Sequence, residues 1–146
     1  MTVNITVDEA QDAILAEFKE HFVGVDANHI AWPNRTYEPT DGEAYVRISV
    51  QHNLAYQPSM GDPAARRTRR EGVVIVQCFT PLGDGTSQSN DLAQEVSDVL
   101  ASKRVQVGAT KPISLKEATI NTVGRDPIHE LWQVNVSVPF WYDQIP

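Results

Sequence analysis

Histidine and cysteine are the residues of this 146-residue chain best suited to chemistry, and their spacing forms no reactive set. The histidines are His21, His29, His52 and His129, and no two of them lie two or four residues apart. Cys78 is the only cysteine, so the sequence contains no pair for a structural zinc site or an internal disulfide. Cys78 lies in an apolar run, where a buried, unreactive thiol is the expected state. These residues predict neither a catalytic centre nor a metal site.

Two further motifs resemble reactive sites but have simpler explanations. The Gly-rich segment 83–86 precedes a helical pattern, as phosphate-binding loops do, but it lacks the lysine and the spacing of a P-loop. A turn that leads into the helix explains it. The pair His129-Glu130 offers two metal-ligating side chains at a strand start, and a solvated strand entry is the favoured interpretation. The sequence therefore predicts no enzyme, no cofactor and no metal.

The chain is acidic, with a net charge of −7, yet its arginines are clustered. Arg66, Arg67, Arg69 and Arg70 lie within five residues and supply a third of the 12 basic residues. An acidic protein is poorly suited to neutralise phosphates, and no aromatic side chain is interleaved with the cluster, as single-strand binders require. We expect the four arginines to form an interaction loop that meets an acidic neighbouring surface. A solvated hairpin tip is the alternative.

Hydrophobic periodicity predicts two helices and four strands. Apolar residues three and four positions apart predict helices at 7–22 and 88–102, and Thr6 and Glu9 form a capping box for the first helix. Alternating or continuous apolar runs predict strands at 45–51, 72–80, 113–122 and 130–142. A short strand near 29–32 is a further candidate. The segment 124–127 is the expected turn between the last two strands.

The resulting order, α-β-β-α-β-β, predicts one α+β domain over residues 1–146. Its expected architecture is two-layered, with both helices on one face of a mostly antiparallel four-stranded sheet. The segment 53–71 exceeds a simple connection and is predicted to be a long hairpin loop. The core is expected to contain apolar residues from both helices and three of the strands, namely Ile14, Phe18, Val46, Ile48, Val74, Val76, Leu92, Val96, Val134 and Val136.

The outward side of the last predicted strand is polar but uncharged. Gln133, Asn135 and Ser137 alternate with the apolar residues that face the core. A freely solvated strand would normally include Lys or Glu. Short uncharged side chains suit a face packed against another subunit, so these three residues are the predicted subunit-interface face.

The sequence contains no sign of a membrane or secreted protein. No run approaches 18 apolar residues, so no membrane span is expected. The first residues lack the basic start and apolar stretch of a signal peptide, and the single cysteine suits a reducing compartment.

The succession of elements, with two local sequences, resembles the tail terminator (tail completion) proteins of long-tailed bacteriophages, including the minor tail protein U type. The two sequences are VQCFTPLGDGTS, which leads into the second helix, and LWQVNVSVPFWYD, which forms the closing strand. The resemblance covers nearly the whole chain. It implies a structural protein of the virion tail, assembled in the host cytoplasm, with no catalytic residue and no cofactor.

The resemblance also implies assembly into a ring, usually a hexamer, that caps the tail tube and stops its polymerisation. The implied partners are other copies of the chain, the tail tube protein and the head-tail connector protein that docks on the ring. Six copies at −7 would carry −42, which suits a central channel through which DNA passes without specific binding.

Two alternatives to a tail terminator stay open at this point. One is a related head-tail connector or tail tube protein, since these share α+β folds and ring assembly. The other is of a different class, a small bacterial ligand-binding or enzyme domain whose site is built from residues scattered along the sequence. A deep pocket would favour the second alternative, whereas an apolar sheet edge and a protruding loop would favour ring assembly.

Overall fold

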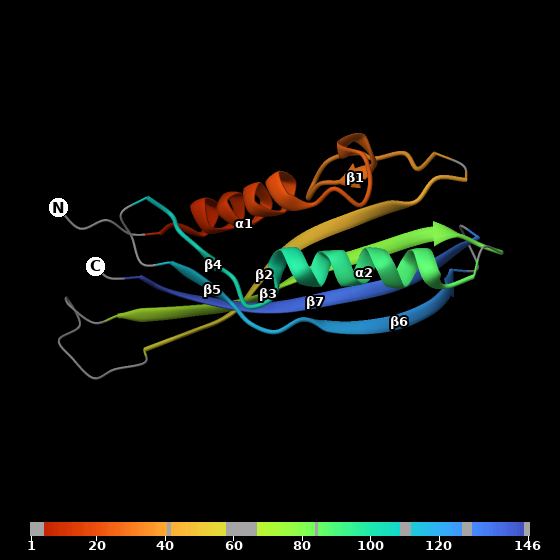
Figure 1. The fold of residues 1–146 in the computed structure, drawn as a ribbon. Coiled ribbons are helices and arrows are strands. Elements are labelled where there is room, and N and C mark those ends of the chain that lie inside the picture. The colour runs from red at the N-terminus through yellow and green to blue at the C-terminus, as the bar shows by residue number, and fades with distance from the viewer. Residues whose placement is uncertain are drawn as a thin grey trace.

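A computed structural model of the chain describes residues 5–40, 42–57, 67–83, 85–108, 112–126 and 130–144 (Figure 1). Two long helices and two long central strands dominate it. The elements in chain order are α1 (Val7–His21), the short 3-10 helix η1 (Ala27–His29), β1 (Ile30–Ala31), β2 (Tyr45–Tyr56), β3 (Thr68–Pro81), α2 (Ser87–Leu100), β4 (Arg104–Val105), β5 (Ile113–Leu115), β6 (Thr119–Asp126) and β7 (Leu131–Gln144).

The first helix begins and packs as its sequence predicts. The Glu9 amide donates to Thr6 Oγ1 at 3.1 Å, and the Thr6 amide donates back to Glu9 Oε1 at 3.4 Å, which completes the capping box. Apolar residues at helical spacing then bury Ala10, Ile14 and Phe18 completely. The second helix follows two glycines with positive φ, at positions 83 and 85, and also buries one apolar face.

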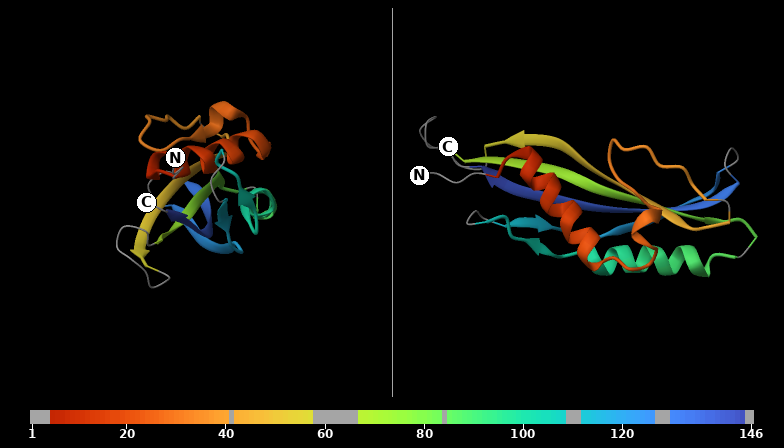
Figure 2. Two further views of the ribbon diagram at one scale, coloured as in Figure 1. Left: turned by 90° about the vertical axis from the view of Figure 1, so that its left-hand side faces the viewer. Right: turned by 90° about the horizontal axis from the view of Figure 1, so that it is seen from above.

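Both helices lie on one side of the sheet and leave its other side open (Figure 2). The inward residues of β3 and β7 alternate with half-exposed ones along both strands. Burial of the inward set creates one core between the layers. All ten predicted core residues are at least 95% buried, so the predicted core is confirmed.

The predicted four-stranded sheet is wrong, because the sheet has seven strands in mixed orientation. Its order is β1-β2-β3-β7-β5-β4, and β6 also pairs with β7. The short strand expected near 29–32 is confirmed as β1, which has two residues and joins β2 in the parallel sense. β4, which was not expected, also has only two residues. Strands this short carry too few residues to show a period of two. The order α-β-β-α-β-β is therefore corrected by the structure.

The predicted strand at 113–122 is two strands, which pair with different parts of β7. Leu115 of β5 lies opposite Phe140, whereas Thr119 of β6 lies opposite Ser137. The break falls opposite Pro139, whose nitrogen has no hydrogen to donate to a neighbouring strand. The Pro139 carbonyl still accepts from the Lys116 amide at 2.8 Å, so the two strands continue along the same border of β7.

The predicted boundaries of the long hairpin and of the last turn also shift. Residues 53–56 and 68–71, expected in the loop 53–71, belong to β2 and β3, which pair as far as Tyr56 and Arg69. Residues 58–66 lie outside the described part of the chain.

The turn expected at 124–127 is strand as far as Asp126. Gly124, whose φ is 104°, ends a bulge in β6.

Candidate interaction surfaces

The arginine-rich segment meets a carboxylate of the same chain at the end of β7. Arg69 donates to Asp143 through Nε at 2.9 Å and through a terminal nitrogen at 3.2 Å, which is the bidentate geometry that arginine forms with carboxylates. Arg67 lies beside the same carboxylate, with its Nε 3.3 Å from Oδ2. The Asp143 side chain is 4% exposed, so two cations enclose one buried charge.

Strand register brings these groups together. Arg69 on β3 lies directly opposite Asp143 on β7, and the Arg69 guanidinium also lies 4.1 Å from the centre of the Trp141 ring. The hydrogen bond to Asp143 is the main cause that raises the pKa of Arg69 above its ordinary value. The ion pair between Arg69 and Asp143 therefore joins two neighbouring strands of the sheet and is not confined to a loop.

The remaining arginines of the cluster differ in their contacts. Arg70 donates from Nε to Gln144 Oε1 at 2.7 Å, and Gln144 in turn donates to the Ile5 carbonyl at 2.7 Å. Arg66 lies outside the described residues. The sequence predicts all four arginines in a loop that faces another protein. In the structure, the cluster instead contacts Trp141, and also Asp143 and Gln144, each of which follows its arginine by 74 residues in the sequence. Only the β3–β7 register identifies these partners, so no local sequence signal predicts them.

The three residues of the predicted subunit-interface face lie at the middle of the open side of the sheet. Asn135 is paired with Gln77 on β3 and with Asn121 on β6, and Ser137 is paired with Ile75 and Thr119. Gln133 donates to Asn135 Oδ1 at 2.8 Å. These paired residues carry no charge, and β7 is flanked by β3 and β6 here. A subunit that contacts the three residues must therefore lie over the open side.

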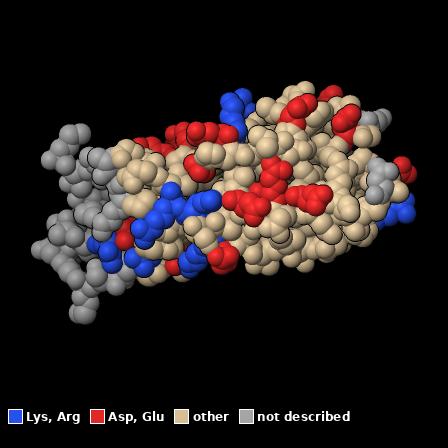
Figure 3. Space-filling model, viewed as in Figure 1, with Lys and Arg blue, Asp and Glu red and all other residues tan. Residues whose placement is uncertain are grey.

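Charged side chains are distributed differently on the opposite side of the molecule. Figure 3 views the helix-covered side and shows acidic side chains over α1 and α2, with basic ones gathered toward the end where β4 and β5 lie. Among the described residues of α2, Asp91, Glu95 and Asp98 supply the negative charge. Glu95 also accepts a hydrogen bond from the Val23 amide at 3.0 Å, which ties α2 to the end of α1.

His52 on β2 and Tyr142 on β7 form a hydrogen-bonded pair. His52 Nε2 lies 2.7 Å from the Tyr142 hydroxyl, and the imidazole packs edge-on against Phe140. Burial is the main cause that lowers the pKa of His52 below its ordinary value of 6.5, and the positive charge of Arg70 is the second.

Cys78 is completely buried, as the sequence predicts, and its burial raises the pKa of the thiol to about 12.

The depressed pKa of His52 predicts a specific loss of stability in mild acid. The folded state binds a proton at His52 less readily than the unfolded state, so its contribution is complete above about pH 6.5 and declines as the pH falls below that value. Urea unfolding of the wild type and of His52→Gln between pH 8 and pH 5 measures the effect. The wild type should lose more stability than the variant over this range; identical pH profiles would contradict the assignment.

The other described histidines lie apart from one another. Among the described residues, the only grouping with metal-ligand chemistry is Glu17, Glu20 and His21 on α1, and two of its three members are exposed. His21 lies 3.4 Å from Glu17 one helical turn away, an ordinary surface pair. His129 lies outside the described residues, and its neighbour Glu130 is exposed.

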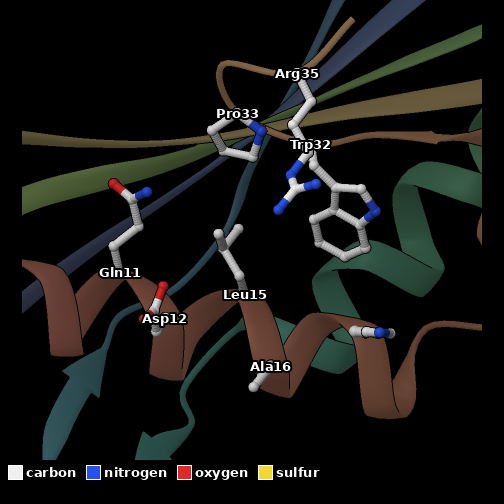
Figure 4. A pocket seen from close by; sticks show the side chains of 8 residues that line it. Gln11, Asp12, Leu15, Ala16, Trp32, Pro33 and Arg35 are labelled. Atoms are coloured by element: carbon white, nitrogen blue, oxygen red, sulfur yellow. The ribbon is translucent and has the colours of Figure 1, made fainter. Parts of the chain in front are cut away.

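A groove of about 450 Å³ lies between α1 and the segment that follows β1 (Figure 4). Leu15 and Trp32 face each other across it, and Asp12 is the only carboxylate among its lining residues. Its other polar lining side chains are Gln11 and the two cations Lys19 and Arg35. No Ser, Thr, Cys or His is among the residues that line this groove.

Comparison with known proteins assigns the chain to a family. Residues 9–140 match the family described as phage tail terminator protein. The chain belongs to the phage tail terminator family. The match covers α1 from residue 9, α2 and every strand, with β7 included as far as residue 140.

Solved structures show that other proteins share the fold of this tail terminator family member. One structure matches 93% of this chain and 95% of its own, at 20% identity and a TM-score of 0.60. Another belongs to the virion of a native gene transfer agent particle and matches 96% of this chain and 98% of its own, at 14% identity and a TM-score of 0.54. No curated protein matches the chain. Within the described residues, no helix has the length and apolar content to cross a membrane.

Proposed function

We propose that this tail terminator family member assembles into a ring, of six copies, that caps the tail tube and stops its polymerisation. Membership of the family carries the proposal. The ring then provides the docking surface for the head-tail connector protein and leaves a channel for DNA. The protein acts without catalysis, cofactor or metal, and its place is the virion tail.

The distribution of charge supports a passive channel. Six copies would carry −42 in total, and a like-charged wall repels DNA instead of binding it.

Two surfaces are proposed to contact other proteins of the tail. The first is the arginine end, the cluster of Arg66, Arg67, Arg69 and Arg70, in which Arg70 bonds Gln144 rather than Asp143. The second is the subunit-interface face of Gln133, Asn135 and Ser137. Side chains on this face are short and uncharged, so another subunit can approach without desolvating an unpaired charge.

The mass and shape of the purified protein test ring formation. Light scattering should give about six times the chain mass of 16.2 kDa, and negative-stain electron microscopy should show rings with a central hole. Incubation with tail tubes should increase the ringed fraction if the tube nucleates the cap. A protein that stays at 16.2 kDa both alone and on tubes would contradict the proposal.

Charges introduced on the subunit-interface face should impair assembly but not folding. Asn135 and Ser137 are half-exposed, so Asn135→Glu with Ser137→Glu should change the unfolding free energy by less than about 1 kcal/mol. Bringing two carboxylates against another subunit should lower the ringed fraction at least tenfold. The matched control is Gln88→Glu with Asn90→Glu on exposed positions of α2. Equal assembly of both variants would exclude the face as a contact.

A further inference from the structure

The groove between α1 and the segment that follows β1, which we call the α1 groove, has apolar walls that are already formed. Leu15 and Trp32 face each other across it (Figure 4). Both side chains are partly buried and pack on the core, and the Trp32 ring meets Phe18 edge-on with ring centres 6.3 Å apart. The Arg35 amide donates to the Trp32 carbonyl at 3.3 Å, which fixes the turn that carries Arg35. A ligand would therefore bind without first having to order these walls.

The two cations of the α1 groove are exposed and have no carboxylate beside them. Among the ion pairs of the described residues, none includes Lys19 or Arg35. Glu17 and Glu20, the carboxylates nearest to Lys19 in the sequence, lie beside His21 instead. Exposed cations without a partner, on a chain that is otherwise acidic, are available to bind a carboxylate from elsewhere.

The carboxylate of the groove lies at the opposite end from Lys19. Figure 4 shows Gln11 and Asp12 at one end of the groove. Asp12 precedes Lys19 on α1 by two helical turns, which is about 10 Å along the helix axis. The Debye length at physiological salt is about 8 Å, so Asp12 repels an anion bound beside Lys19 only weakly. The groove is therefore polarised along α1, with the site for an anion at the Lys19 end.

The residue types of the α1 groove suit a protein ligand better than a nucleic acid. Tryptophan and arginine are the residue types most enriched where binding energy concentrates in protein interfaces, and the arginine fork matches a carboxylate. Nucleic acid would bring a long row of phosphates, which two cations cannot neutralise. The surface over α1 is also acidic, as Figure 3 shows, and would repel the remaining phosphates. A segment with few negative charges, close to one apolar side chain, fits the groove.

We propose that the α1 groove binds a short acidic segment of another protein. The segment inserts one large apolar side chain between Leu15 and Trp32 and directs a neighbouring carboxylate toward Lys19 and Arg35. The groove lies on the helix-covered side of the molecule, whereas the subunit-interface face lies on the open side of the sheet. A ring that uses the open side leaves the groove accessible, so this contact goes beyond the proposed function and does not depend on it.

Binding of a defined peptide tests the chemistry of the groove. The probe is a capped heptapeptide with one phenylalanine between two aspartates, in a background of glycine and serine. Fluorine NMR of the protein labelled with fluorotryptophan reports on the groove, once Trp32→Phe has assigned the Trp32 resonance. The peptide should shift this resonance saturably and leave those of the other two tryptophans unchanged. Peptides with lysine in place of aspartate, or serine in place of phenylalanine, should bind at least about fivefold more weakly.

Charge reversal separates the groove from the net charge of the chain. Lys19→Glu with Arg35→Glu should weaken binding of the acidic peptide at least about fivefold, because two attractions become repulsions. The matched control, Lys103→Glu with Lys116→Glu, changes the net charge equally at exposed positions and should bind the peptide as the wild type does. Circular dichroism establishes that both variants are folded.

Three outcomes would overturn the inference. The first is no saturable shift of the Trp32 resonance, and the second is an equal loss of binding in both charge-reversal variants. The third is a loss of rings in the Lys19 and Arg35 variant alone, measured by light scattering, which would show that a second copy of the chain occupies the groove. The expected result is that this variant loses the peptide and keeps the ring, so a failure of peptide binding leaves the proposed function standing.

Discussion

Replacing Phe18 by alanine is expected to destabilise the fold by about 3–5 kcal/mol, because the truncated side chain leaves a cavity that the core cannot refill. Phe18 is completely buried, stacks on Phe22 with ring centres 4.6 Å apart, and meets Trp32 edge-on at 6.3 Å. These contacts join α1 to the segment that follows β1. Urea unfolding followed by tryptophan fluorescence measures the loss.

The matched control for Phe18→Ala is Val23→Ala, just beyond the end of α1. Val23 is 81% exposed, so its truncation should cost less than about 0.5 kcal/mol. Equal effects of the two substitutions would show that α1 does not pack on the sheet as described.

Replacing Asp143 by alanine is the second change with a large expected effect, of about 2–4 kcal/mol, because it leaves two arginines beside an apolar site without their carboxylate. The expected loss of stability is smaller than for a completely buried ion pair, because the side chains of Arg67 and Arg69 are 32% and 24% exposed. Urea unfolding at neutral pH measures it. The loss should exceed that of Glu71→Ala, because Glu71 is a less buried carboxylate on β3 that accepts a hydrogen bond from the Tyr56 hydroxyl at 3.1 Å.

The role of Asp143 also changes how the arginine cluster must be tested. Serine at Arg67 and Arg69 would leave the Asp143 carboxylate buried and unpaired, so a loss of assembly in that variant would include a loss of folding. Serine at Arg66 and Arg70 retains both partners of Asp143. If that pair of substitutions leaves capping unchanged at raised salt, the interaction role of the arginine end is wrong.

The helices and the core were predictable because their signals are local and repeat several times. The capping box and the spacing of Ala10, Ile14 and Phe18 identify α1 without any tertiary knowledge. β7 is recognised from alternation over many residues, and β3 from a continuous apolar run. The family resemblance was equally accessible, since it rests on the order of these long elements.

The number of strands was not predictable, since it depends on short and long-range pairings. β4 has only two residues, which contain no period, whereas β1 falls within the short strand expected near 29–32. Likewise, the break between β5 and β6 is determined by Pro139 on another strand. The same limit applies to the arginine cluster: its cations were evident, but Asp143 becomes their partner only through the register of β3 with β7.

The length of tail tubes grown in the presence of the protein tests the central claim most directly. Purified tube protein should polymerise into long tubes of broad length distribution when alone, as measured by electron microscopy. Adding this protein at one ring per tube end should halt growth, shorten the tubes, and leave a ring-shaped density at one end. Tubes that keep the same length distribution and bare ends would contradict the assignment of a capping function.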